Sequence, residues 1–143
     1  MPRGIPSEVI QHFQSVPLFS AVSKKGIRSI VSAATEVDVG AGRVLVQEGD
    51  YDRDLFVILR GEATVTQRGR KLATLGPGDF FGELALLERS PRTATVRAAT
   101  DMRVMVLGRR EVLDIVEREP PLARRMLEVL ASRVRANESS VQH

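Results

Sequence analysis

The sequence predicts a mainly β fold: an eight-stranded antiparallel β-roll, similar to a jelly roll, with helices before it and C-terminal helices after it. Three observations support this prediction. Apolar residues recur at helical spacing near the start of the 143 residues. From Thr35 they alternate in short runs that glycines interrupt, and from Arg109 the helical spacing returns. Short alternating runs between glycine turns are typical of antiparallel rolls and barrels.

Residues 1–34 are expected to form an N-terminal helical segment. Ser7 begins the helical pattern SEVIQHF, and Ser23 begins SKKGIRSIVSAA. Serine is favoured before a helix because its hydroxyl accepts a hydrogen bond from an amide of the first turn. Between the two helices, Leu18 and Phe19 are expected to pack a tight turn.

The β-roll is expected over residues 35–108. Breaks at Gly61–Glu62, at 68–70 and at 76–79 divide most of this region into short strands. Glycine adopts the backbone angles that tight turns require, so these breaks indicate strand ends.

Helices are expected again over residues 109–137. The pattern RREVLDIVERE has apolar residues on one face, and the next helix begins near Pro120, where proline is favoured. We interpret residues 138–143 as a polar tail or the start of a linker.

The composition excludes several classes of site. There are no cysteines, so disulfides and thiolate sites are excluded, and a cytoplasmic location is expected. No apolar run approaches the ~18 residues that a membrane helix needs. The net charge of +3 raises the question of a nucleic-acid partner. Many arginines of the last third fall at helical spacing, so we interpret them as a solvated helix face instead.

The segment FGELALLERSPRTATV combines one carboxylate and one guanidinium with small and apolar residues. Gly82 lets the backbone approach a ligand, and the amides of Leu84 and Ala85 are unpaired donors of a first helical turn. Such amides beside the guanidinium of Arg92 make a site for a phosphate. Glu83 then suits a ribose hydroxyl, as acidic residues do in dinucleotide sites. The segment therefore indicates a ribose phosphate site.

Spacing alone leaves a second interpretation of this segment open. Glu83 and Arg92 can form a salt bridge that merely holds a loop together, and Gly82 can be only a turn residue. The residue types do not decide between a ligand site and such a bridge.

The chain resembles the cyclic nucleotide-binding domain family over nearly its whole length. This family includes regulatory subunits of cyclic-AMP-dependent protein kinase, bacterial catabolite-activator regulators and cyclic-nucleotide-gated channels. The segment at 81–93 is similar to the family's phosphate-binding cassette. Supporting matches are VLVQEGD (44–50), DLFVILRGEATV (54–65) and LGPGDFFGE (75–83). The resemblance implies a cyclic nucleotide ligand, with cyclic AMP (cAMP) expected.

The resemblance implies a role for each matching cassette residue. Arg92 would pair with the exocyclic oxygens of the phosphate, and Glu83 would accept the ribose 2′-hydroxyl. Backbone groups would add contacts with the ribose and the phosphate at Gly82, Leu84 and Ala85.

The resemblance also implies which residues surround the base. Leu72 and Ala73 match positions that line its pocket, and Thr93 would bond the phosphate and contact the base. A hydroxyl at the Thr93 position can help select cyclic GMP (cGMP), so a cGMP-selective sensor is the alternative to a cAMP sensor. The resemblance makes the last helix a lid, and Arg133 in this helix would cover the base. A solvated arginine is the alternative there, with an apolar neighbour such as Leu130 as the cap.

An enzyme is the first rival interpretation, and the sequence argues against it. The only histidines, His12 and His143, lie outside the expected strands, so a facial metal site lacks ligands. No serine–histidine constellation is available either. We therefore expect no catalytic residues, no metal and no cofactor.

A ligand-free interaction module of the same fold is the second rival. Such domains often lose the arginine or the acidic residue of the cassette, whereas this chain keeps both Glu83 and Arg92. The family resemblance implies instead a switch, in which the C-terminal helix moves when the ligand binds. It would act on a protein effector in trans, or on one in a missing part of the chain, since no DNA-binding domain or membrane segment is visible in the sequence.

Overall fold

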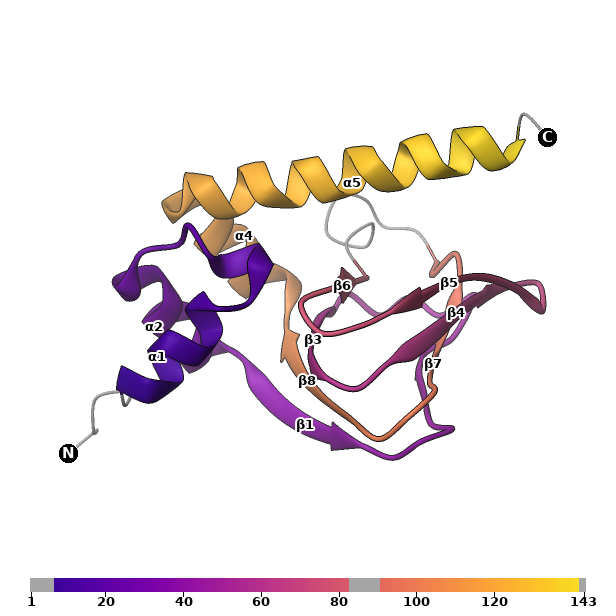
Figure 1. Cartoon of the computed structure of the whole chain (residues 1–143), viewed down its shortest axis with the longest axis horizontal. Helices are drawn as coiled ribbons and strands as arrows, with labels where there is room; N and C mark the ends of the chain where they lie inside the picture. The colour runs from indigo at the N-terminus through magenta and orange to yellow at the C-terminus, as the bar shows by residue number, and fades with distance from the viewer. Residues whose placement is uncertain (1–6, 83–90, 142–143) are drawn as a thin grey trace.

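Two four-stranded antiparallel sheets form the body of the protein, and helices cover one end and one side (Figure 1). The computed structural model describes residues 7–82 and 91–141. In chain order the elements are α1 (Ser7–Gln14), the 3-10 helix η1 (Pro17–Phe19), α2 (Lys24–Ala33), β1 (Thr35–Val39), β2 (Val44–Val46), β3 (Leu55–Arg60), β4 (Ala63–Gln67), β5 (Arg70–Leu75), β6 (Phe80–Phe81), β7 (Thr95–Ala98), β8 (Met102–Leu107), α4 (Arg109–Arg118) and α5 (Pro120–Val141).

The strand order confirms the predicted eight-stranded antiparallel roll. One sheet has the order β1-β8-β3-β6 and the other has the order β2-β7-β4-β5. The last helix is longer than predicted, because α5 continues to Val141 rather than ending at residue 137. No glycine or proline follows Pro121, so nothing in the local sequence stops the helix. Within residues 7–82 and 91–141, none of the helices is long and apolar enough to cross a membrane.

Strand β3 contributes to two separate cores. Its first five residues are all buried, and β3 lies inside the first sheet between β8 and β6. Leu55, Val57 and Leu59 pack in the cluster that the helices cover, whereas Phe56 and Ile58 pack inside the roll. Side chains alternate between the two faces of a strand, so a strand with both faces covered is apolar throughout.

The end of β6 is fixed by an aromatic contact. The rings of Phe56 and Phe81 are stacked, with centroids 4.9 Å apart and an interplanar angle of 5°. Both rings belong to the core inside the roll. This contact positions the backbone immediately before Gly82, the second residue of the cassette.

The helices are tied together at the junction between α4 and α5. The hydroxyl of Ser23 accepts a hydrogen bond from the amide of Gly26 at 3.0 Å, as predicted for an N-cap. The amide and the hydroxyl of Ser23 also donate to Glu119 Oε1, at 3.1 and 2.9 Å. Glu119 is the C-cap of α4 and precedes α5. The start of α5 is therefore anchored to the start of α2.

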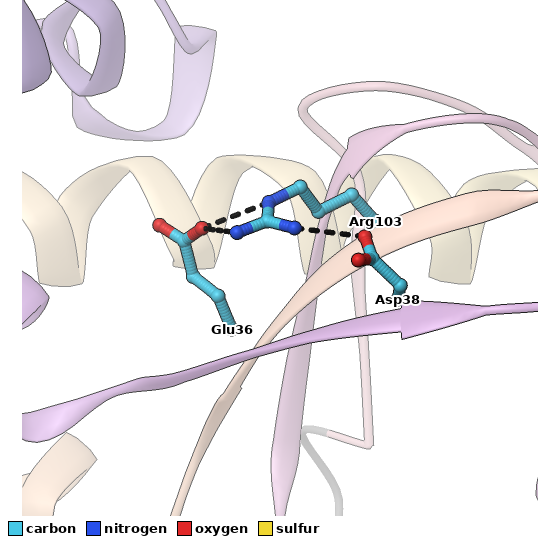
Figure 2. Close-up of polar contacts among 3 residues, drawn as sticks. All are labelled: Glu36, Asp38 and Arg103. Atoms are coloured by element: carbon cyan, nitrogen blue, oxygen red, sulfur yellow. Dashed lines mark hydrogen bonds and ion pairs between the residues drawn. The ribbon is translucent and has the colours of Figure 1, made fainter.

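A charged cluster joins the edge strand β1 to β8 (Figure 2). Arg103 on β8 contacts Glu36 Oε2 at 2.6 Å and Asp38 Oδ1 at 2.8 Å, both on β1. Hydrogen bonds to Glu36 and to Asp38 raise the pKa of Arg103. The three side chains lie on a solvated face, where ion pairs add little stability. We therefore interpret this cluster as a structural link between strands and not as a site.

Candidate functional site

Arg92 is the charged side chain on which the site is built. It lies shortly before β7 and is 7% exposed, and no other polar or charged residue is buried in the part of the chain that the structure describes. Its backbone amide donates to the carbonyl oxygen of Asp50 at 2.7 Å. Its own carbonyl oxygen accepts from the amide of Gly49 at 2.9 Å. Arg92 is thereby held against the turn that follows β2.

The guanidinium of Arg92 contacts three acceptors of the protein itself. Nη1 donates to the carbonyl oxygen of Gly82 at 3.0 Å, and Nη2 donates to the carbonyl oxygen of Asp54 at 2.7 Å. Nε donates to Asp52 Oδ1, with which Nη2 also forms an ion pair. Burying a guanidinium is costly unless its charge is balanced and its N–H groups have acceptors. Here Asp52 balances the charge, and the carbonyl oxygens of Gly82 and Asp54 accept the hydrogen bonds.

Gly82 lies directly against this guanidinium. Its φ is +92°, in a region that residues with a side chain rarely adopt. A Cβ atom added here would stand 2.5 Å from the carbonyl oxygen of Asp54 and 2.6 Å from Nη1 of Arg92. The close backbone approach predicted for Gly82 thus serves a contact within the protein, and its contact with a ligand stays a prediction.

The carboxyl group of Asp54 lies in an unfavourable environment. Burial raises its pKa above the usual value, the nearby Asp52 carboxylate raises it further, and Arg92 opposes this shift. The folded protein therefore holds a proton on Asp54 more tightly than the unfolded chain does. The stability gained from this proton is present at low pH and is lost as the pH rises through the folded-state pKa.

Arg133 of α5 contacts β6 next to the Arg92 site. Its guanidinium carbon lies 4.7 Å from the centroid of the Phe80 ring, and Nη2 donates to the carbonyl oxygen of Phe80. Phe80 belongs to β6, and Gly82, which contacts Arg92, directly follows this strand. α5 and Arg92 therefore contact the same short stretch of backbone. Arg133 is half-buried and stacks on an aromatic ring of the protein, and its contact with a base stays a prediction.

Leu72 and Ala73 lie on β5, and Thr93 directly follows Arg92 in the chain. Leu72 and Ala73 are exposed on β5, the edge strand of the second sheet, and Leu72 is 52% exposed. Thr93 is exposed shortly before β7, and its carbonyl oxygen accepts from Gln67 Nε2 of β4 at 3.0 Å. Because β4 separates β5 from β7, these residues flank one strand, and their contact with a base stays a prediction.

Three predicted ligand contacts lie outside the described residues. Glu83, Leu84 and Ala85 belong to the segment 83–90, as does the predicted helical turn. Of the predicted cassette residues, the structure brings Gly82 and Arg92 into direct contact.

Asp52 also belongs to this site, although no sequence motif indicated it. Asp52 lies in the stretch GDYDRD, between two motifs that were recognised, and 40 positions separate it from Arg92. Local periodicity carries no information about such a distant partner. The one available signal was the concentration of acidic residues before β3, since grouped carboxylates need a cation nearby.

The described residues contain no cluster that suits a metal. No group of three or more His, Cys, Asp or Glu side chains that could hold an ion occurs within 7–82 and 91–141. The charged centre of the described site is instead one buried guanidinium, that of Arg92.

Comparison with protein families matches residues 36–119 to the cyclic nucleotide-binding domain. The chain belongs to this family. Its members are regulatory and sensor domains rather than enzymes, so the domain is one of these. The resemblance inferred from the cassette and the strand motifs is confirmed.

The similar proteins include a kinase regulatory subunit, a channel and a catabolite activator, which are the three classes of protein named in the resemblance. The cAMP-dependent protein kinase regulatory subunit of Yarrowia lipolytica is 37% identical over 98 residues, which cover 67% of this chain and 26% of that protein. A cyclic nucleotide-gated potassium channel of Rhizobium etli is 38% identical over 93 residues, 65% of this chain and 26% of the channel. The crystal structure of the Thermus thermophilus catabolite activator protein matches with a TM-score of 0.77 and 28% identity, covering 88% of this chain and 62% of that one. This chain thus spans about a quarter of the length of the first two.

The contact between Gly82 and Arg92 predicts the effect of adding a side chain. We expect Gly82→Ala to lower the free energy of unfolding by about 2–4 kcal/mol, because it adds a collision to the strain of a positive φ. Gly42→Ala is the matched control, since Gly42 has a φ of +89° with nothing within 4 Å of an added Cβ. Urea unfolding of both variants measures the difference. Equal losses in the two variants would show that the space around Gly82 is not restricted.

Because the pKa of Asp54 is raised, a variant without this carboxyl should be more stable than the wild type at neutral pH but not at acidic pH. We expect Asp54→Asn to raise the unfolding temperature at pH 7 and to change it little at about pH 3, where a carboxyl is mostly protonated in both states. Thermal unfolding followed by circular dichroism at both pH values measures this. The exposed Asp114 of α4 offers a control, Asp114→Asn. A lower unfolding temperature of Asp54→Asn at pH 7 would contradict the interpretation.

Proposed function

We propose that this cyclic nucleotide-binding domain is a cAMP sensor, and that ligand binding changes the position of α5. Family membership supports the ligand class, and the name of the Yarrowia lipolytica relative, a cAMP-dependent regulatory subunit, supports cAMP. The observation that carries the proposal is the buried guanidinium of Arg92 at the cassette, next to the end of β6.

The proposed ligand chemistry follows from this guanidinium. The phosphate of a cyclic nucleotide is a phosphodiester with a single negative charge, which one arginine can neutralise. A planar guanidinium forms two parallel hydrogen bonds with such a group, so it selects geometry as well as charge. We assign the phosphate to Arg92 with Thr93, the ribose to Glu83, and further backbone contacts to Gly82, Leu84 and Ala85. For the base we propose Leu72, Ala73 and Arg133.

The proposed switch follows from how α5 is attached. Leu122 and Met126, near its start, are buried in the helix-covered core, whereas Leu127 and Val134 are 67% and 55% exposed. Further along, Arg133 contacts Phe80 on β6. α5 runs along one side of the roll, above β6 in the view of Figure 1. A ligand beside β6 would shift α5 only through different affinities for two arrangements of this contact.

The effector of the switch is also a proposal. The chain spans only part of the proteins it resembles, which are by name a protein kinase regulatory subunit and a cyclic nucleotide-gated potassium channel. We infer a protein effector, either in trans or elsewhere in the same polypeptide. A cytoplasmic location, expected from the absence of cysteine, stays a prediction.

Calorimetric titration of nucleotide-stripped protein tests the function and the role of Arg92 together. We expect one-to-one binding of cAMP that is tighter than binding of cGMP. Arg92→Lys keeps the charge but loses the planar fork, so it should weaken cAMP binding by about tenfold or more. The same change at the exposed Arg60 of β3, Arg60→Lys, is the control and should leave the affinity within about twofold.

Three results would change this account in different ways. Absence of binding to either nucleotide would contradict the sensor function. Tighter binding of cGMP would keep the sensor and replace the ligand. Equal binding by the wild type and Arg92→Lys would place the phosphate elsewhere.

A further inference from the structure

We propose that Asp52 is an affinity-determining residue of the nucleotide site, because its carboxylate occupies the edge of the Arg92 guanidinium that a phosphate needs. The ligand must displace this carboxylate in order to bind. This inference rests on the proposed function and adds to it a residue that neither the cassette nor the family comparison indicates.

The contacts of the guanidinium place Asp52 on a binding edge. Arginine forms paired hydrogen bonds with a carboxylate or a phosphate through two neighbouring nitrogens. The edge formed by Nε and Nη2 faces Asp52 Oδ1. On the other edge, Nη1 and Nη2 donate to the carbonyl oxygens of Gly82 and Asp54. A phosphate that pairs with two nitrogens of Arg92 must therefore replace at least one acceptor that is already in place.

Asp52 is the acceptor that can leave. The carbonyl oxygens of Gly82 and Asp54 belong to the backbone at the end of β6 and just before β3, and the pairing of these two strands holds them. The Asp52 side chain is 41% exposed, whereas the Arg92 side chain is 5% exposed. Asp52 lies in the irregular stretch 51–54 between β2 and β3. Its carboxylate can therefore turn into solvent while the backbone contacts of Arg92 persist.

The charges of the site favour an exchange of one anion for another. Without a bound anion, a buried guanidinium needs an internal counter-ion, and Asp52 provides it. A phosphodiester that arrives with one negative charge restores the same balance once Asp52 has turned away. The measured affinity is then the difference between two ion pairs with Arg92. Removing the charge of Asp52 should tighten nucleotide binding, although Asp52 contacts the arginine directly.

The test compares two neighbouring aspartates in the complete chain. Asp52→Asn removes the competing charge, and Asp50→Asn removes an equal charge from the same loop, where only the backbone of Asp50 contacts Arg92 in the described structure. Calorimetric titration with cAMP should show Asp52→Asn binding about three- to tenfold more tightly than wild type. Asp50→Asn should stay within about twofold. Asp52→Ala is a second variant with the same expected direction, and thermal unfolding checks that each variant is folded.

The possible results separate this inference from the proposed function. Tighter binding by Asp52→Asn alone, or binding by Asp52→Asn when the wild type binds too weakly to measure, supports the competition. If the wild type binds cAMP and Asp52→Asn binds equally or more weakly, the inference is overturned and the sensor function stands. Equal tightening by Asp50→Asn also overturns it, because a general charge effect then explains the result. If neither protein binds a cyclic nucleotide, both proposals are overturned.

Discussion

The other features of the site depend on the contacts that the buried guanidinium of Arg92 makes. A charge at 7% exposure is tolerated only if its surroundings supply acceptors and a counter-ion. The carbonyl groups of Asp54 and Gly82 supply the acceptors, and Asp52 supplies the charge. Asp52 and Asp54 lie 40 and 38 positions before Arg92, whereas Gly82 lies 10 positions before it. The roll is therefore what assembles the site, and the site in turn requires a glycine at position 82.

The short strand β6 connects this site to the rest of the molecule. Phe80 contacts Arg133 of α5, Phe81 stacks on Phe56 in the core of the roll, and the next residue, Gly82, contacts Arg92. Three consecutive residues thus join the C-terminal helix, the core and the Arg92 guanidinium. A ligand that changes the contacts of Arg92 acts on the same strand that α5 rests on, which gives the proposed switch a short physical route.

The features that local sequence patterns encode were predicted, and those that depend on distant contacts were not. Alternation and glycine turns predicted the roll, and Ser23 was recognised as a cap. Gly82 and Arg92, grouped in one segment by the sequence, are in direct contact. The pairing of Arg92 with Asp52 and the contact of Arg133 with Phe80 join residues 40 and 53 positions apart. Such contacts follow from the packing of the strands, and no periodicity or spacing in the sequence reports them.

A crystal structure of the protein with bound cAMP would show directly what Arg92 and Asp52 do. We expect the phosphate to lie within hydrogen-bonding distance of the Arg92 guanidinium and the Asp52 carboxylate to have turned away. We also expect the carbonyl groups of Gly82 and Asp54 to keep their contacts with Arg92. A nucleotide bound elsewhere, with the pair of Arg92 and Asp52 intact, would contradict this expectation, because the buried guanidinium would then be only a structural ion pair.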